Sequence, residues 1–147
     1  MIRYVRIFSS AAFFSICLVG CGGNKAPAGA AMAKPQLTHG TITFPNGTPL
    51  LGGIVTFKPV DVNAGGGKIR YDAAALVDAD GRYKLGFNGD GSGAPSGDYV
   101  VVIEPRELNE LPKSNVSQIP SPYKEKATTP LKATVKDGDN KFDFELK

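Results

Sequence analysis

The sequence predicts an all-β protein, a seven-stranded antiparallel β-sandwich that occupies residues 36–147. From Gln36 onward, apolar residues alternate with polar ones in short runs, which is the period of a half-buried strand. Clusters of Gly, Pro, Asn and Asp separate these runs, as turns separate the strands of a sandwich. A helical period is absent, and the stretch Glu107–Leu111 could form one turn at most.

The first two segments alternate cleanly. Ile42 and Phe44 alternate with threonines before a Pro-Asn-Gly turn, and Val55 and Phe57 repeat the pattern before a proline. The third segment, 69–77, has three alanines in its middle, so the register of this segment stays open.

The other four segments are bounded by acidic or glycine-rich turns. Asp80-Gly81 is a tight-turn signal before the fourth segment, and a glycine-rich loop precedes the fifth. In the last segment, charged residues occupy the face opposite the apolar ones. The apolar positions expected in the core are, segment by segment, Ile42 and Phe44; Val55 and Phe57; the apolar residues of 69–77; Tyr83, Leu85 and Phe87; Tyr99, Val101 and Ile103; Leu131, Ala133 and Val135; and Phe142, Phe144 and Leu146.

If each segment runs opposite to the one before, the loops alternate between the two ends of the domain. The loops at 45–52, 78–81 and 105–130 then share one end, and those at 60–67, 88–97 and 137–140 share the other. The segment 105–130 contains five prolines and is long for a loop without secondary structure. Two interpretations remain open for it, a binding surface or a strap over a sheet edge.

The N-terminus carries a targeting motif. Arg3 and Arg6 precede an apolar run from Ile7 to Gly20, which is the pattern of a secretory signal peptide. This run is shorter than the roughly 20 residues that a membrane-spanning helix needs. The sequence Leu18-Val19-Gly20-Cys21 resembles the bacterial lipobox. The resemblance implies cleavage before Cys21 and lipidation of the Cys21 thiol.

Three parts of the chain follow from this motif: a lipoprotein signal peptide at 1–20, a flexible Ala/Gly/Pro tether at 21–35, and the β-sandwich domain at 36–147. Cleavage lowers the formal net charge from +3 to +1, because it removes two of the 17 basic residues and no acidic residue. No basic stripe remains for a nucleic acid, so none is expected as a partner. Since Cys17 is also removed, the folded part has no thiol or disulfide.

The order of turn motifs is similar to that of carboxypeptidase-regulatory-like, or transthyretin-like, β-sandwich domains, and it covers most of 38–147. That family implies a seven-stranded, usually non-catalytic sandwich on secreted or surface proteins, and it implies no ligand. The matching pieces are Gly40-Thr41-Ile42-Thr43, Asn46-Gly47-Thr48-Pro49-Leu50, Gly53-Ile54-Val55-Thr56-Phe57, Asp78-Ala79-Asp80-Gly81-Arg82-Tyr83-Lys84-Leu85 and Ala94-Pro95-Ser96-Gly97-Asp98-Tyr99-Val100-Val101. The ending resembles that of small bacterial lipoproteins of this type, through Ile119-Pro120, Tyr123, Leu131, Val135, Asn140 and the residues 142–146.

Residues for catalysis are sparse. His39 is the single histidine, and no serine or cysteine motif accompanies it, so neither nucleophilic catalysis nor a zinc site is predicted. Hydroxyisourate hydrolase shares the transthyretin-like fold, but it relies on several histidines and a C-terminal Tyr-Arg-Gly-Ser. This chain instead ends with the residues 144–147, Phe-Glu-Leu-Lys. We therefore predict neither an enzyme nor a cofactor.

Two other kinds of site stay open. Asp78 and Asp80 begin like a calcium loop, but Gly89 occupies the twelfth position, and a capped β-turn explains the same residues. Lys58, Asn140 and Glu104 are residue types that could form an isopeptide crosslink, although any β domain offers such triples.

The expected function is that of a lipid-anchored, non-catalytic lipoprotein of the bacterial cell envelope. Its expected partners are membrane lipid, through acylated Cys21, and an envelope protein or carbohydrate. The alternative is a calcium- or small-ligand-binding periplasmic module. Gly22 follows the lipidation site where an Asp would signal inner-membrane retention, which favours the outer membrane.

Overall fold

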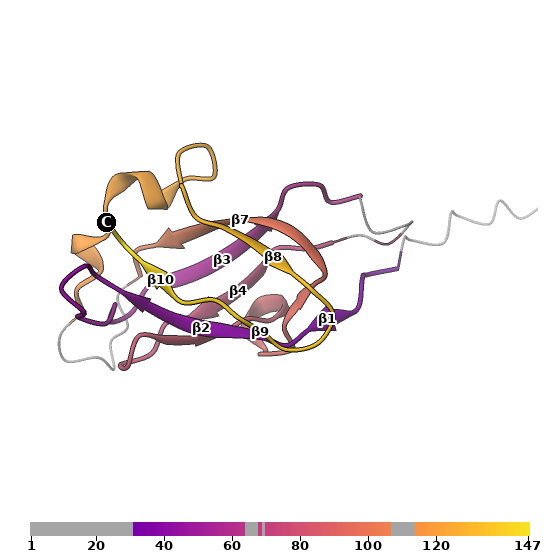
Figure 1. Cartoon of the computed structure of the whole chain (residues 1–147), viewed down its shortest axis with the longest axis horizontal. Helices are drawn as coiled ribbons and strands as arrows, with labels where there is room; N and C mark the ends of the chain where they lie inside the picture. Colours follow the sequence, from indigo (N-terminus) through magenta and orange to yellow (C-terminus); the bar gives the residue numbers. More distant parts are fainter. Residues whose placement is uncertain (1–30, 64–67, 69, 107–113) are drawn as a thin grey trace, which may run out of the picture.

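The structure is a computed structural model that describes residues 31–63, 68, 70–106 and 114–147. These residues form β-strands and three short 3₁₀ helices, and they contain no α-helix (Figure 1). The all-β prediction is confirmed. The 3₁₀ helices are η1 (Phe87–Gly89), η2 (Val116–Gln118) and η3 (Ser121–Lys124).

Two open sheets face each other across a common core, which gives the domain a β-sandwich-like character. One sheet has the order β4-β3-β7-β8 and is antiparallel throughout; in the other, β2 lies between β5 on one side and β9 and β10 on the other. A short pair, β1-β6, adds to these sheets. The strands are β1 (Pro35–Gln36), β2 (Thr38–Thr43), β3 (Ile54–Pro59), β4 (Ala73–Leu76), β5 (Arg82–Lys84), β6 (Ala94–Pro95), β7 (Gly97–Glu104), β8 (Lys132–Val135), β9 (Asn140–Lys141) and β10 (Phe144–Glu145).

The pairing of the last strands with β2 corrects the expectation of a wholly antiparallel sandwich. β9 and β10 run parallel to β2, with Phe144 opposite Ile42. The reason lies in the strand reversals, because the first and the last of the expected segments have six reversals between them and so point the same way. When two such segments become neighbours, they can pair only in parallel.

The strand count also differs from the expected seven, since the described residues form ten strand elements. The last expected segment is divided into β9 and β10 around Phe142 and Asp143. The two-residue strands β1 and β6 were not predicted, because neither has an alternating pattern. Pro35 pairs with Pro95, and Gln36 pairs with Ala94.

The two ends of the domain can be named from the loops that they carry. We call the end with the loops 45–52 and 78–81 the distal end; there the N–H of Gly53 donates to the carbonyl of Arg106 at 2.9 Å. The chain enters through β1 at the opposite end, the entry end, where the N–H of Val60 donates to the carbonyl of Asp98 at 2.9 Å. Figure 1 shows β1 at the right and the distal end at the left.

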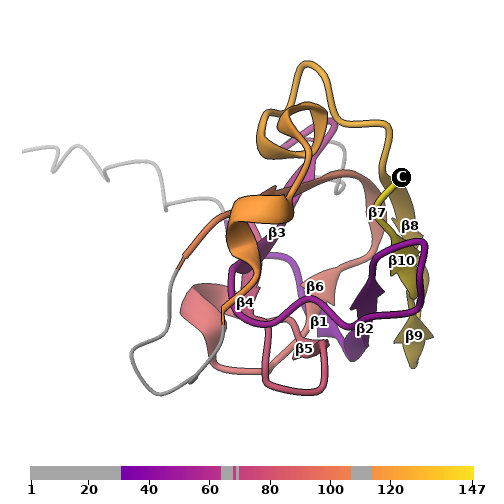
Figure 2. The same ribbon diagram turned by 90° about the vertical axis from the view of Figure 1, so that its left-hand side faces the viewer.

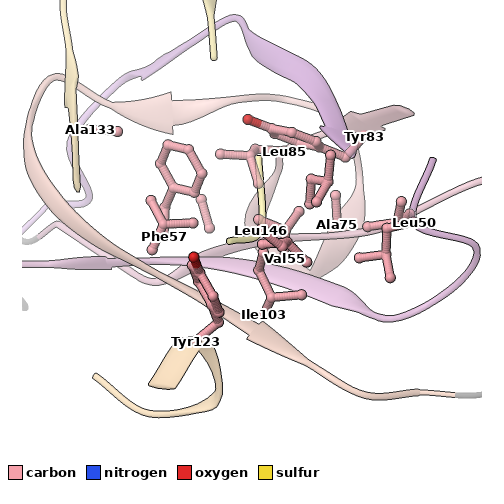
Figure 3. Packing of buried hydrophobic residues seen from close by; sticks show 14 of the residues in the cluster. Leu50, Val55, Phe57, Ala75, Tyr83, Leu85, Ile103, Tyr123, Ala133 and Leu146 are labelled. Carbon is pink, nitrogen blue, oxygen red and sulfur yellow. The ribbon is translucent and has the colours of Figure 1, made fainter. Parts of the chain in front are cut away.

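Phe57 lies at the centre of the core (Figure 3). Its side chain is fully buried, and its ring centroid lies within 6.3 Å of those of four other aromatic rings. These four are Tyr83, Tyr99, Phe142 and Phe144.

The predicted orientation of the C-terminal segment is confirmed, because its apolar and charged residues lie on the expected faces. Leu146 is buried, while Phe142 and Phe144 are half-buried against the core. In the alanine segment, Ala73 and Ala75 are the positions that face the core.

Phe87 was expected in the core, and this prediction was wrong. Its side chain is 41% exposed, and it lies in η1 rather than on a strand. β5, the strand of the fourth expected segment, ends at Lys84, and the chain then turns through Gly86 into η1, so the alternation that pointed Phe87 inward stops too early. Its ring packs against that of Tyr71 with a centroid distance of 5.0 Å.

The described part of the long loop, 114–130, is a packed strap rather than a structureless insertion. η2 and η3 lie in it, and its side chains Val116, Ile119 and Tyr123 are buried. The Tyr123 hydroxyl accepts a hydrogen bond from the N–H of Lys147 at 2.8 Å, so the strap also holds the C-terminal residue. Residues 107–113 lie outside the described part of the chain.

Asn115 fixes the strap to the distal loop, and its loss is expected to destabilise the domain. Its side-chain oxygen accepts the N–H of Leu51 at 2.7 Å, and its amide donates to the carbonyl of Pro49 at 3.0 Å. Asn115→Ala should therefore lower the free energy of unfolding by about 1–3 kcal/mol, the range for leaving such groups unpaired. Urea denaturation measures this, with Gln118→Ala as the control because Gln118 is exposed in the same segment. Equal effects of the two variants would contradict a fastening role for Asn115.

Candidate functional site

A concave site is lined by residues of β4 and β5, which are edge strands of the two sheets. Figure 2 shows these two strands as neighbours. The two edges are joined at one point, where Ala74 and Gly86 exchange backbone hydrogen bonds of 3.0 and 3.1 Å. Beside this link a cavity of about 510 Å³ opens to solvent. We call it the edge groove.

The floor of the edge groove is apolar. It is formed by Ile54 and Leu76, which are opposite one another on β3 and β4, together with Ala75 and Tyr83. Leu76 is half exposed, since its side chain points away from the core on the last strand of its sheet. An apolar floor of this kind can take up an aliphatic side chain or the apolar part of a ligand.

The rim of the edge groove is cationic. Arg82, Lys84 and Arg106 line it, whereas Asp78 is the one carboxylate among its described lining residues. None of the ion pairs formed between described residues involves these three cations. The rim therefore carries an excess of positive charge that favours an anionic group.

Local structure holds the three cations in place. Arg82 follows a tight turn in which the Asp78 carboxylate accepts the N–H groups of Asp80 and Arg82, at 2.9 and 2.8 Å. Lys84 lies on β5 opposite His39, and Arg106 is positioned by its carbonyl, which binds Gly53. Turn and strand geometry thus bring cations from two distant parts of the sequence to one rim.

Tyr83 is a structural residue within this groove. Its hydroxyl donates to the carbonyl of Phe142 at 2.7 Å, and burial raises the pKa of the phenol well above its usual value, with a further rise from the nearby Asp143 carboxylate. The phenol therefore stays protonated at neutral pH and does not supply a nucleophile.

The turn capped by Asp78 gives the residues 78–81 a structural explanation. Because one Asp78 oxygen already accepts two backbone N–H groups, the arrangement is that of the capped β-turn. In the described part of the chain, no three His, Cys, Asp or Glu side chains are grouped in a way that could hold a metal ion.

His39 lies at the entry end, far along β2 from the distal loops. Its Nε2 lies 3.1 Å from a carboxylate oxygen of Asp139. In the same turn, two residues earlier, Asp137 accepts a hydrogen bond from the Ser96 hydroxyl at 2.6 Å. Sequence reasoning did not single out Ser96. Ser96 donates to a carboxylate rather than to the imidazole, so these contacts do not form the nucleophile–base pair of a hydrolase.

The structure does not bring the isopeptide candidates together. Lys58 is paired with Asp72 at 3.2 Å, and the Asn140 side chain holds the turn before β9 through bonds to Lys136 and Gly138. Glu104 lies at the distal end of β7, four positions along from the partner of Lys58. At about 3.3 Å per residue, that separation exceeds 10 Å.

Cys21 lies outside the described residues, so its lipidation remains a prediction. Among the described residues, no helix is both long and apolar enough to cross a bilayer. Arg82 and Lys84 were not predicted as site residues, because they look like the solvated face of a short strand. Arg106 was expected as an exposed charge of the loop 105–130, for which a binding surface was one of two interpretations. No feature of the sequence links Arg82 and Lys84 to Arg106.

Together, the fold and the groove define a β-sandwich-like domain with a cationic site at an open edge. No protein-family model, curated protein or solved structure matches this chain.

Proposed function

We propose that this chain is a lipid-anchored, non-catalytic module of the bacterial cell envelope, and that it acts by contact with another envelope molecule. The observation that carries the contact function is the edge groove. Its rim supplies three cations, its floor supplies apolar surface, and its one phenol is hydrogen-bonded within the fold. These groups favour binding rather than a chemical step.

The position of the chain entry supports the anchored arrangement. Residues 31–34 lead into β1 at the entry end, so a lipid on Cys21 would connect to the domain at that end (Figure 1). The 14 residues between Cys21 and Gln36 would span about 20 Å as a flexible coil. The distal end and much of the edge groove would then be directed away from the lipid surface.

The anchor predicts a difference between the two cysteines. Cys21→Ser should abolish lipidation and also the cleavage before position 21, because the thiol that would carry the diacylglyceryl group is gone, so the variant should lack the diacylglyceryl mass and keep residues 1–20. Cys17→Ser should retain the lipid and partition into detergent, since Cys17 would be removed with residues 1–20. Intact-mass spectrometry and detergent phase separation measure these outcomes. A wild-type protein that is unmodified and water-soluble would overturn the proposal.

A further inference from the structure

We propose that the edge groove binds an acidic, extended peptide segment of another protein, which adds to the β4 edge as an extra strand. This inference rests on the proposed contact function and names the chemistry of the partner. Its support comes from the backbone at the groove, from the apolar floor and from the charges of the rim.

At Leu76, the backbone of β4 has an N–H and a carbonyl group that no described residue uses. Ala74 directs its N–H and carbonyl away from β3, because both bind Gly86. Successive residues of a strand point their backbone groups to opposite sides, so Leu76, two positions on, has the same direction as Ala74. β4 is the last strand of its sheet, and no described strand pairs with it at Leu76.

The β5 edge faces the groove in the same way. The N–H of Leu85 binds the carbonyl of Thr38, so the backbone groups of Lys84, one position earlier, point away from β2. β5 is also the last strand of its sheet. A segment lying in the groove would thus meet unpaired backbone groups of Leu76 on β4 and of Lys84 on β5. Hydrogen bonding to such exposed edge groups is the basis of peptide recognition by strand addition.

Side-chain recognition follows from the floor and the rim. In an added strand, alternate side chains point to opposite sides. One set would contact Leu76 and Ile54, and carboxylates of the segment would reach Arg82 and Arg106, whose guanidinium groups can bind them through two parallel hydrogen bonds. A small anion would use the rim alone, whereas an acidic extended peptide uses the rim, the floor and both edges.

The first test measures binding of a labelled hexapeptide of alternating Glu and Val to the full-length chain in detergent, by fluorescence anisotropy. Salt at about 0.15 M screens weak attraction between exposed charges. The control is a labelled hexapeptide of alternating Lys and Val. We expect saturable binding of the Glu/Val peptide and at least about tenfold weaker binding of the Lys/Val peptide, a difference in binding free energy of about 1.4 kcal/mol. Absence of binding up to about 1 mM, or equal binding of both peptides, would overturn the proposal.

A second peptide separates strand addition from simple charge attraction. The Glu/Val hexapeptide with N-methyl groups on alternate amides keeps every carboxylate but loses main-chain donors. If an extra strand forms, one of the two possible N-methylation patterns should bind at least about tenfold more weakly than the parent. If both patterns bind like the parent, or if an acidic polysaccharide competes as well as the peptide does, the groove is a general anion site and the proposal fails.

The protein variants locate the site. Arg82→Glu combined with Arg106→Glu should weaken binding of the Glu/Val peptide by at least about tenfold, whereas Lys132→Glu, on β8 at the other edge of the sheet, should not. Thermal unfolding of each variant checks that the fold is kept, and a single Lys84→Glu change serves if the double variant unfolds. Equal binding by all variants would overturn the location. Because these measurements do not depend on lipidation, they can fail while the anchor is confirmed, and the reverse.

Discussion

Phe57→Ala is expected to lower the free energy of unfolding by about 3–5 kcal/mol, the range for truncating a fully buried aromatic ring. Phe57 has no exposed surface, and four other rings surround it, so its removal leaves a cavity between the sheets that few neighbours can fill. Denaturant unfolding of the chain from residue 31 onward, which contains every described element, measures the effect.

The matched control is Phe87→Ala. Phe87 is 41% exposed and packs mainly on Tyr71, so its truncation should cost about 1 kcal/mol, the value of one aromatic pair. If the two variants lose the same stability, Phe57 does not lie at the centre of a core between the sheets.

Gly40→Ala is expected to have the second large effect, because it disturbs the contact between β2 and the last strands. A Cβ atom at position 40 would overlap the carbonyl oxygen of Phe142. That carbonyl accepts the Tyr83 hydroxyl, and the N–H of Phe142 donates to the carbonyl of His39. The backbone must shift, so we expect a loss of about 3 kcal/mol or more, at the upper end of the range for overpacking. Hydrogen exchange of the amides of residues 142–146 should show that the loss is concentrated in β10.

Gly47→Ala serves as the control for Gly40→Ala. Gly47 has a φ of +80°, and no atom lies within 4 Å of the added Cβ, so this change costs only backbone strain of about 1–2 kcal/mol. Unfolding experiments compare the two variants directly. A smaller loss for Gly40→Ala than for Gly47→Ala would show that Phe142 does not approach Gly40 closely.

Local patterns in the sequence determined which residues form most of the strands and which faces are buried. Alternation placed Val55, Phe57 and Tyr99 in the core correctly, because a pleated strand sends successive side chains to opposite faces. It failed at Phe87, where Gly86 turns the chain before the pattern ends. Alternation gave no signal for the strap, which the proline-rich loop left open as one of two interpretations, since Val116, Ile119 and Tyr123 are spaced irregularly over two 3₁₀ turns.

The motif at Cys21 is likewise a property of the sequence, because a signal peptide is recognised as a linear segment. The edge groove is not. Leu76 and Arg106 are separated by 30 positions, and they meet only because β4 and β7 both pair with β3. The parallel contact of β10 with β2 has the same origin. The chain reversals at the turns set the direction of each segment locally, but which strands become neighbours depends on how the whole chain closes its core. Only the tertiary structure therefore decided the strand pairing and the site that this pairing creates.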